Sequence, residues 1–507
     1  MVSAYKRPGV YVSEFTTASS SAVGPIGISS AAFVGPTWRG PTAATLVQTW
    51  AQFVQQYGGF SPDDARFSYL PYSVFAFFNN GGRDCFISRA IGTGALKSSL
   101  VLLDKAATPQ ATLTVSADNE GTWGNNIYVQ VVERDAATGR FDLIVRNGGT
   151  GDQFIVERWL DLSMATTDAR YVVSLINDVN NGSVFISVLD MGSATASPSD
   201  IPAVLAATAL TGGADGAAPD TSQTSTAINA LDTVDGPFGL NLPGDSNTTN
   251  IGSAITYASG RGDSFAVIDT ALGLTPAQAA SYAASLSASG YGAVYYPWVK
   301  VIDPSSSSST SVRSLPPGGA VLGQYAQTDT TRGPFKAPAG LQARLASAVG
   351  TELKMSLTDL DTLAASGVNA IRQIPGSGIT IMGARTLKTT GADQYVNVRR
   401  TLIYLKTSLL AGTRWALFEP NDPTLWSGIQ ISLQQFLTNF WKQGGLRGKT
   451  AAEAFYVLCD ATNNTPSTIQ NGEVHVEVGV ALQFPAEFIV IQLGQWESGS
   501  SAQELTV

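Results

Sequence analysis

Residues 395–426 read YVNVRRTLIYLKTSLLAGTRWALFEPNDPTLW and contain two helix signals joined by a short apolar segment. In the first half, apolar residues recur at steps of three and four. These residues are Tyr395, Val398, Leu402, Leu405 and Leu409. This spacing predicts a helix with one apolar face. Gly412 stands where a left-handed C-terminal cap is expected.

The second half of the stretch predicts a short strand and another helix. Residues 414–419 (RWALFE) are few and apolar, which is typical of a buried strand. Asp422 followed by Pro423 is typical of an N-cap with proline in the first turn. The following helix should end at Gly444, and its apolar stripe comprises Trp426, Ile429, Leu433, Phe436, Leu437, Phe440 and Trp441. We expect most of these side chains to be ordinary core, and the stretch holds no catalytic constellation.

Composition favours a multidomain chain with an unusually neutral surface. Its 507 residues exceed one ordinary core and indicate two to four domains. Charged residues make up 14%, against about a quarter in typical soluble domains. A surface buried against other subunits would have this composition, and so would a surface rich in glycine and serine.

Charge and cysteine content exclude several classes of partner. The net charge of −9 and the lack of clustered Lys and Arg argue against nucleic acid as the main partner. The tight pair Arg399 and Arg400 is interpreted as a solvated helix face. Cys85 and Cys459 form no CxxC motif, so we expect buried free thiols and neither a disulfide nor a zinc site. We expect no cofactor and no metal.

The ends of the chain predict neither export nor membrane insertion. The first residues, MVSAYKRPGVYVSEF, lack the apolar core of a signal peptide. No apolar run reaches the length of a transmembrane helix. We therefore expect a soluble protein, not secreted by the general route, that inserts into no membrane.

The pattern along the chain changes several times. Residues 1–30 predict an arm whose short strand must pair elsewhere, because a lone strand is not stable. Residues 31–94 alternate strands with a helix at 72–78. Residues 95–214 contain alternating apolar segments separated by turn residues, which predicts a mostly β insertion.

Residues 215–300 have a βαβ pattern. Strands are predicted at 238–242, 265–269 and 293–296, and helices at about 248–259 and after Thr275. Thr275 is a candidate N-cap with Pro276 at the first helical position, and Gly290 lies after the end of that helix. Strands that alternate with helices predict a parallel sheet.

Short motifs that suggest enzymes fail on inspection. A Ser-His-Asp mechanism needs an imidazole base, and the one histidine, His475, lies on the predicted polar face of a strand outside the βαβ region. Residues 444–450 (GGLRGKT) resemble a phosphate-binding loop, but Gln443 stands where the motif needs glycine. Thr450 and Glu453 fit a capping box instead. Residues 261–263 (RGD) fit a turn, and the glycines at 376, 378 and 383 fit a hinge. We predict no catalytic, cofactor-binding or metal-binding residues.

Several ordered segments resemble contractile-tail sheath proteins of myophages and related injection machines. The first are YKRPGVYVSEF (5–15), AAFVG (31–35), TWAQFVQQYGGF (49–60) and FFNNGGRDCFISRA (77–90). YYPWVKVIDP (295–304), LPPGGAVLGQYAQTDTTRGPFKAPAG (315–340) and GVNAIRQIPGSGITIMGARTL (367–387) continue the series. AFYVLCDATNNTP (454–466) and EVGVALQFPAEFIVIQL (477–493) complete it. Residues 95–214 match weakly.

The resemblance implies an α/β, multidomain fold. Its parts would be an N-terminal linking arm (1–30), a subtilisin-like central domain (31–94 and 215–375), a β-rich outward insertion (95–214), an α+β tube-facing C-terminal domain (376–485) and a C-terminal linking arm (486–507). The arms would enter neighbouring subunits through Tyr5, Val10, Tyr11, Val12 and Phe15 at one end. At the other end they would enter through Phe488, Ile489, Val490, Ile491 and Leu493.

The resemblance also implies a function and partners. Subunits would form stacked sixfold rings around an inner tail tube and contract to drive that tube through a cell envelope. The partners would be further copies of the chain, the tube protein, and baseplate and terminator proteins, in a virion tail assembled in the host cytoplasm. A phage-derived extracellular injection system is an alternative within this class. A subtilisin-like hydrolase and a nucleotide hydrolase are alternatives from another class.

Overall fold

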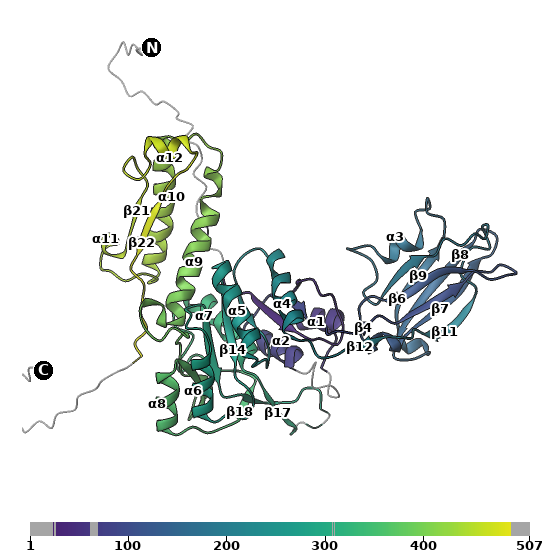
Figure 1. Ribbon diagram of the computed structural model, residues 1–507, viewed down its shortest axis with the longest axis horizontal. Helices are drawn as coiled ribbons and strands as arrows, with labels where there is room; N and C mark the ends of the chain where they lie inside the picture. The colour runs from purple at the N-terminus through teal and green to yellow at the C-terminus, as the bar shows by residue number, and fades with distance from the viewer. Residues whose placement is uncertain (1–23, 25–26, 61–68, 307, 309, 488–507) are drawn as a thin grey trace, which may run out of the picture.

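The computed structural model describes residue 24 and residues 27–60, 69–306, 308 and 310–487. An eight-stranded sheet lies at its centre, in the order β2-β3-β1-β13-β14-β15-β19-β20 (Figure 1). The inner pairs are parallel, and the two edge strands β2 and β20 run antiparallel to their neighbours. The strands are β1 (Ala31–Gly35), β2 (Thr45–Val47), β3 (Cys85–Arg89), β13 (Phe238–Asn241), β14 (Ser264–Asp269), β15 (Gly292–Tyr296), β19 (Val368–Ile374) and β20 (Gly378–Ile381). The predicted parallel sheet is confirmed.

Helices cover both faces of this sheet, and each face has its own apolar core. One face is covered by α1 (Trp50–Tyr57), α2 (Tyr69–Asn79) and α7 (Gly318–Arg332). The other is covered by α4 (Thr221–Asn229), α5 (Thr248–Arg261), α6 (Pro276–Ser285) and α8 (Leu357–Ala365). Because both faces are covered, the inner strands carry mostly apolar side chains, and every residue of β14 is buried, including Ser264 and Asp269 at its ends.

Local signals fixed the ends of several of these helices. Thr275 caps α6 in a capping box with Gln278, and Pro276 is its first residue, as predicted. Gly262 ends α5 in the left-handed conformation, which makes residues 261–263 a turn. Glycines also allow α7 to touch α2, because a Cβ at Gly319 would lie 2.2 Å from the Ser73 carbonyl oxygen. A smaller sheet, β17-β16-β18, comprises β16 (Val299–Ile302), β17 (Val312–Leu315) and β18 (Ala348–Thr351).

A separate β-rich unit projects from the central sheet between β3 and α4 (Figure 1). Its two antiparallel sheets enclose a third apolar core. They comprise β5 (Ser99–Leu103), β6 (Ala111–Ala117) and β10 (Ile186–Asp190), then β7 (Ile127–Asp135), β8 (Arg140–Asn147), β9 (Ile155–Leu162) and β11 (Leu205–Ala209), with the short helix α3 (Val172–Ile176). β4 (Ala95–Leu96) pairs with β12 (Ala214–Asp215), so the unit begins and ends at one narrow neck.

Two long helices, two short helices and a small sheet form the C-terminal unit. It contains α9 (Val396–Gly412), α10 (Pro423–Lys442), α11 (Ala451–Ala454), β21 (Phe455–Leu458), α12 (Pro466–Gln470) and β22 (Glu477–Val480). The stripe predicted on α10 is confirmed, and Asp422 caps that helix through the Leu425 amide. α9 contributes Val396 to the central core and Leu405 to the C-terminal core, so it joins the two units.

Three predictions in the opening stretch are wrong. Residues 414–419 form no strand: Arg414–Ala416 is a single 3-10 turn, and Leu417 and Phe418 face solvent. Between two antiparallel helices there is no neighbouring strand for this segment to join. Gly412 is the last helical residue of α9 and is buried, and the cap is Thr413. Arg400 is buried by a partner on α7, so the arginine pair is not a solvated face.

Three further local predictions are also wrong. Gly376 lies in the tight turn between β19 and β20, and Gly378 is the first residue of β20. Both adopt positive φ angles, and this paired hairpin is not a hinge. Thr450 makes no side-chain cap, and Glu453 accepts a hydrogen bond from the Lys449 amide and not from the Thr450 amide. His475 precedes β22 and is not part of that strand.

Candidate functional site

A two-stranded sheet in the C-terminal unit has an open edge. β21 and β22 pair antiparallel, with Val457 opposite Val478. The Ala481 amide donates to the Ala454 carbonyl oxygen at 2.8 Å. Because hydrogen-bonded and non-hydrogen-bonded pairs alternate along an antiparallel ladder, the backbone groups of Val478 and Val480 point away from β21. Among the described residues, no group pairs with them. A further strand can therefore add at β22.

The outer edge of β21 is already occupied. The Phe455 amide donates to the Ala451 carbonyl of α11. The Gln430 side chain on α10 donates to the Val457 carbonyl at 3.1 Å. Strand addition is therefore directed to β22, because a new strand at β21 would have to displace these contacts.

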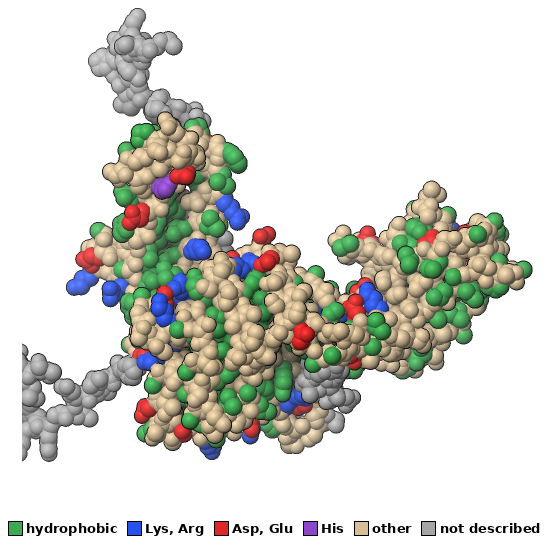
Figure 2. Space-filling view, in the orientation of Figure 1, with side chains coloured by type: hydrophobic (Ala, Val, Ile, Leu, Met, Phe, Trp, Pro, Cys, Tyr) green, Lys and Arg blue, Asp and Glu red, His purple; other side chains and the backbone are tan. Residues whose placement is uncertain are grey.

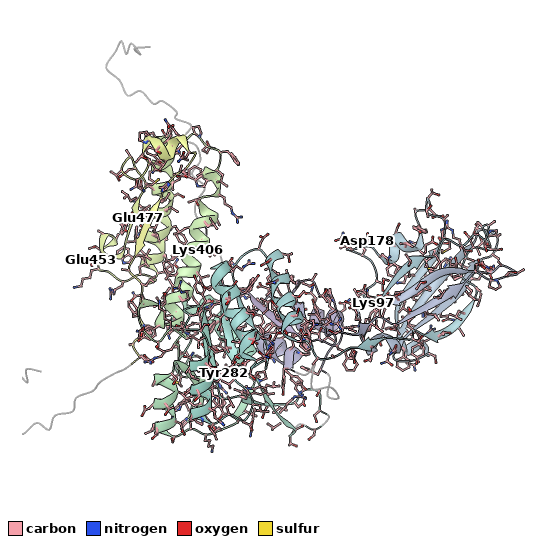
Figure 3. The ribbon with its side chains drawn as sticks, in the orientation of Figure 1. Lys97, Asp178, Tyr282, Lys406, Glu453 and Glu477 are labelled. Atoms are coloured by element: carbon pink, nitrogen blue, oxygen red, sulfur yellow. The ribbon has the colours of Figure 1, made fainter. Side chains whose placement is uncertain are left out.

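One face of this sheet packs on α10, and the other faces solvent. Val457 and Val478 belong to the apolar cluster around α10. On the solvent face, the Tyr456 ring lies across Gly479, where a Cβ would come within 2.0 Å of it. The Tyr456 hydroxyl donates to Glu477 at 2.5 Å, and Figure 3 shows Glu477 on this unit. This cross-strand contact fixes the register of the short sheet.

The last described residues are tied to the base of the C-terminal unit. Arg385 donates to both carboxylate oxygens of Glu487, each at 2.8 Å. The Tyr395 hydroxyl donates to the same carboxylate at 3.3 Å. Asn397 donates to the Gln483 carbonyl oxygen at 3.1 Å. Hydrogen bonds therefore fix the position of the chain at Glu487, the last described residue.

The first described residues are tied down by a second arginine. Arg400 donates to both oxygens of Asp329, at 2.9 Å from Nη1, and both side chains are buried. The same guanidinium donates to the Ile28 carbonyl at 3.4 Å and lies 4.4 Å from the centre of the Tyr325 ring. Burial raises the pKa of the Asp329 carboxyl, and the Arg400 charge opposes this shift. Arg400, which lies in α9, therefore fixes Ile28 near the first described residues. Arg385 fixes Glu487, the last described residue.

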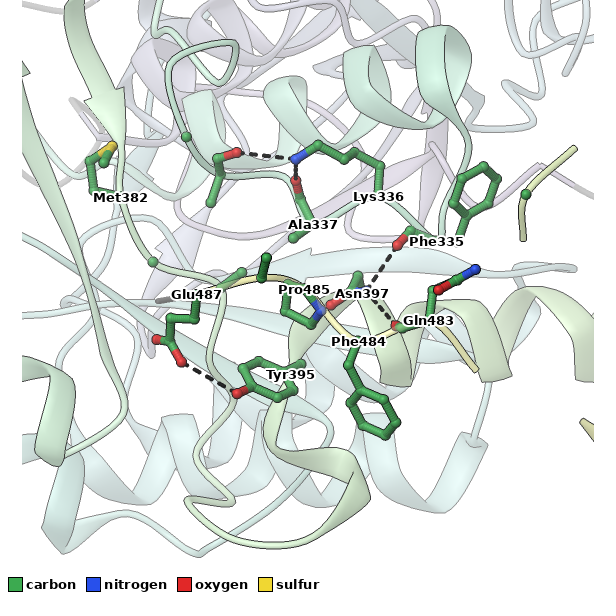
Figure 4. Close-up of a pocket in the computed structure, with 16 residues that line it drawn as sticks. Phe335, Lys336, Ala337, Met382, Tyr395, Asn397, Gln483, Phe484, Pro485 and Glu487 are labelled. Atoms are coloured by element: carbon green, nitrogen blue, oxygen red, sulfur yellow. Dashed lines mark hydrogen bonds between the residues drawn. The ribbon is translucent and has the colours of Figure 1, made fainter. Parts of the chain in front are cut away.

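A cavity of about 560 Å³ lies between the central sheet and residues 483–487 (Figure 4). Its lining is mostly apolar, with Phe335, Met382, Tyr395, Phe484 and Pro485. Lys336 also lines it and donates to the carbonyls of Ala337 and Ala339. Asn397 holds one side by donating to the Phe335 carbonyl oxygen at 2.9 Å.

The ten arm residues predicted from the sequence lie outside the described residues. These are Tyr5, Val10, Tyr11, Val12 and Phe15, and Phe488, Ile489, Val490, Ile491 and Leu493. The tied positions Ile28 and Glu487 were missed, because their partners lie far away in the sequence. Each position had one signal in the sequence, a single charged residue among apolar neighbours. Arg400 lies on an amphipathic helix, and Glu487 precedes an apolar run.

Nothing in the described residues forms a catalytic constellation around the one histidine. His475 is exposed, and its imidazole pairs with Glu473 at 3.0 Å (Figure 2). Cys85 and Cys459 are buried free thiols, as predicted. The described ranges contain no cluster of His, Cys, Asp and Glu suited to a metal ion. None of their helices is long and apolar enough to cross a membrane.

Comparison with known proteins gives the family. The family model of the phage tail sheath protein central domain matches residues 218–387, and that of the phage tail sheath C-terminal domain matches residues 392–494. The tail sheath protein of Vibrio phage KVP40 is 28% identical over 183 residues, which cover 35% of this chain and 26% of that protein. The chain belongs to the family of contractile phage tail sheath proteins.

Solved structures share the fold over nearly the whole chain. The sheath of an extracellular contractile injection system (PVC) in the contracted state has a TM-score of 0.61 at 20% identity, with 97% of this chain and 98% of that chain covered. A sheath tail protein from Listeria innocua has a TM-score of 0.62 at 12% identity, with 92% and 97% covered. The chain aligns with only 26% to 51% of the length of the curated relatives it matches.

Proposed function

We propose that this chain is the structural subunit of a contractile tail sheath. Copies polymerise as stacked sixfold rings around an inner tail tube and contract to drive the tube through the envelope of a target cell. The observation that carries this proposal is the open edge of β22 in a chain whose two ends leave from fixed points. A two-stranded sheet is marginal by itself and gains stability when strands add to it.

The arms supply the missing strands. Residues 5–15 and residues 488–493 are β-prone segments that lie beyond the tied points Ile28 and Glu487. In the polymer, each adds to the β21–β22 sheet of a neighbouring copy. Tyr5, Val10, Tyr11, Val12 and Phe15 form the N-terminal contact. The C-terminal contact comprises Phe488, Ile489, Val490, Ile491 and Leu493.

Contraction is a rigid-body movement of subunits about these arms. The subtilisin-like central domain comprises residues 31–94 and 215–375, and the insertion 95–214 faces outward. The C-terminal domain, residues 376–485, faces the tube, and the linking arms are residues 1–30 and 486–507. The energy of contraction is stored in the extended lattice, so the sheath itself needs no nucleotide. The partners are further copies, the tube protein and the proteins at the two ends of the tail.

The host machine is either a phage tail or an extracellular injection system. The match to the PVC sheath covers 97% of this chain and supports the second, whereas the curated KVP40 relative supports the first. We place the protein in a virion tail. Capsid and terminase genes beside the coding sequence would agree with this, and their absence beside an AAA+ ATPase gene and toxin genes would indicate an injection system.

A hydrolase has less support. The imidazole of His475 belongs to the C-terminal unit, whereas the buried carboxylate Asp269 belongs to the central sheet. Asp269 instead accepts hydrogen bonds from Asn241 and from the Gly244 and Gly318 amides, which fixes the start of α7. Retained polymerisation by a His475→Gln variant would agree with a structural role.

Removal of one arm tests the proposal directly. Deletion of residues 1–15 should leave a folded monomer that forms no sheath by negative-stain electron microscopy. Val490→Pro should also block assembly because proline removes a strand hydrogen bond. Val490→Thr is the matched control, since it keeps the backbone amide and should polymerise. Normal tubes from the deletion variant would refute the arm exchange.

A further inference from the structure

An exposed apolar knob lies at the tip of the α9–α10 hairpin, at residues 417–419 (Leu-Phe-Glu). Leu417 is 67% exposed and Phe418 is fully exposed. Phe418 has a φ of 66°, a left-handed conformation that is rare for a bulky residue and strains the backbone. Such strain in an exposed aromatic residue is characteristic of a binding position.

Hydrogen bonds hold the knob in place. The Leu417 amide donates to the Arg414 carbonyl at 3.2 Å, and the Glu419 amide donates to the Ala416 carbonyl at 3.4 Å. Asn421 then accepts from the Trp426 indole at 2.8 Å. The knob is therefore presented in a defined conformation before any partner arrives, which reduces the entropy lost on binding.

The cavity of about 560 Å³ in Figure 4 has the complementary chemistry. Its walls are aromatic and aliphatic side chains, among them Phe335, Met382 and Phe484. Its volume lies within the range of pockets that enclose small apolar groups. Asn397 lines it with a buried side-chain oxygen that has no hydrogen-bond partner, so a donor is missing there.

Charges match as well. Lys336 makes no ion pair with a carboxylate in the described part of the chain and donates only to carbonyl oxygens. Burial lowers the pKa of Lys336, and the nearby Arg332 lowers it further. A carboxylate placed beside Lys336 would therefore stabilise its charged ammonium form. Glu419 follows Phe418 directly and is exposed, and it has no ion-pair partner within the described ranges. Glu487 also lines the cavity, but its carboxylate is already paired with Arg385. Lys336 is therefore the lining charge without a counter-charge in the described residues, and Glu419 supplies a carboxylate for it.

The knob cannot enter the cavity of its own chain. The cavity includes Tyr395 and Asn397 at the start of α9, whereas the knob follows the end of that helix. α9 has 17 residues and is therefore about 25 Å long. Figure 1 shows the hairpin tip and the base of the C-terminal unit at opposite ends.

We propose that residues 417–419 of one copy dock into the cavity of the next copy, with Phe418 and Leu417 inside and Glu419 beside Lys336. Different surfaces meet in this contact, and such head-to-tail interfaces generate rings when the rotation closes and open helical filaments when it does not. The docking contact rests on the proposed function, because it forms only between copies in a polymer. It does not depend on strand exchange by the arms. It links successive C-terminal units directly.

Cross-linking tests the contact. The full-length double variant Phe418→Cys/Met382→Cys should give a ladder of covalent multimers on a non-reducing gel after polymerisation and mild oxidation. Each single-cysteine variant should give no ladder, and buried Cys85 and Cys459 serve as the unchanged background. Normal tubes from the double variant without a ladder would overturn the contact while leaving the sheath function intact. Failure of the wild-type chain to polymerise would instead count against the proposed function.

Charge reversal gives a second readout. Glu419→Lys and Lys336→Glu should each raise the critical concentration for polymerisation about tenfold, equivalent to about 1.4 kcal/mol. The two changes together should restore it. Glu473→Lys is the matched control, because it places the same charge on an exposed position of the same unit. If Phe418→Ser polymerises normally but no longer binds purified tube protein, the partner of the knob is the tube and the proposal is wrong.

Discussion

Arg400 and Asp329 lie 71 positions apart and form a two-point ion pair with both side chains buried. The pair joins α9 of the C-terminal unit to α7 of the central sheet. Its guanidinium also holds the Ile28 carbonyl, so three distant segments meet at one side chain.

Loss of one member of this pair should be costly. Arg400→Met leaves the Asp329 carboxylate buried without a counter-charge, and we expect a loss of about 3–5 kcal/mol in urea unfolding followed by circular dichroism. Arg400→Met/Asp329→Leu should recover most of it. Lys406→Met on the same helix is exposed and should change stability by less than about 0.5 kcal/mol. A loss below about 1 kcal/mol for Arg400→Met would contradict the structural role.

Asp269 should make stability depend on pH. Burial raises the pKa of this carboxyl from 3.8 to about 6, against the opposing effect of three hydrogen bonds. Because the folded state favours the protonated form, its contribution is complete below about pH 4 and is lost as the pH rises through 6. The loss is about 3 kcal/mol. The stability difference between Asp269→Asn and wild type should shift in favour of the variant between pH 4 and pH 7. A flat difference would refute this assignment.

The Tyr456–Gly479 contact should tolerate no added methyl group. Gly479→Ala places a Cβ 2.0 Å from the Tyr456 ring. We expect the displaced ring to destabilise the β21–β22 sheet by about 1–3 kcal/mol, seen as faster amide hydrogen exchange in both strands. Gly479→Ala/Tyr456→Ala should restore slow exchange. Unchanged protection in the single variant would show that the ring has room to move.

Glu487 should hold the last described segment. Glu487→Gln weakens a two-point, partly exposed ion pair with Arg385, worth about 1 kcal/mol. Amide hydrogen exchange in residues 481–487 should then accelerate about fivefold. Glu473→Gln, which removes a fully surface contact with His475, should leave these amides unchanged. Equal exchange in both variants would mean that the ion pair of Glu487 does not hold this segment.

The sequence predicted elements whose signals are local. α6 follows from Thr275 and Pro276, which are adjacent in the sequence. α10 follows from Asp422 and an uninterrupted apolar stripe. The parallel sheet follows from buried strands that alternate with such helices.

Features that depend on distant partners could not be predicted in this way. The burial of Arg400 is decided by Asp329, and the position of Glu487 by Arg385, 102 residues earlier. Residues 414–419 have strand-like composition, but burial depends on a neighbouring strand, and the helices on either side provide none. The exposed Phe418 therefore resembled core in the sequence.

The neck formed by β4 and β12 joins the β-rich unit to the central sheet through one paired crossing. Since the chain leaves and re-enters the central sheet through paired residues, material of any compatible size can be exchanged at this point without altering the register of the sheet. Changes of length or sequence inside the β-rich unit therefore need not alter the strand order of the central sheet. The same neck offers protein engineers a single grafting position for foreign domains.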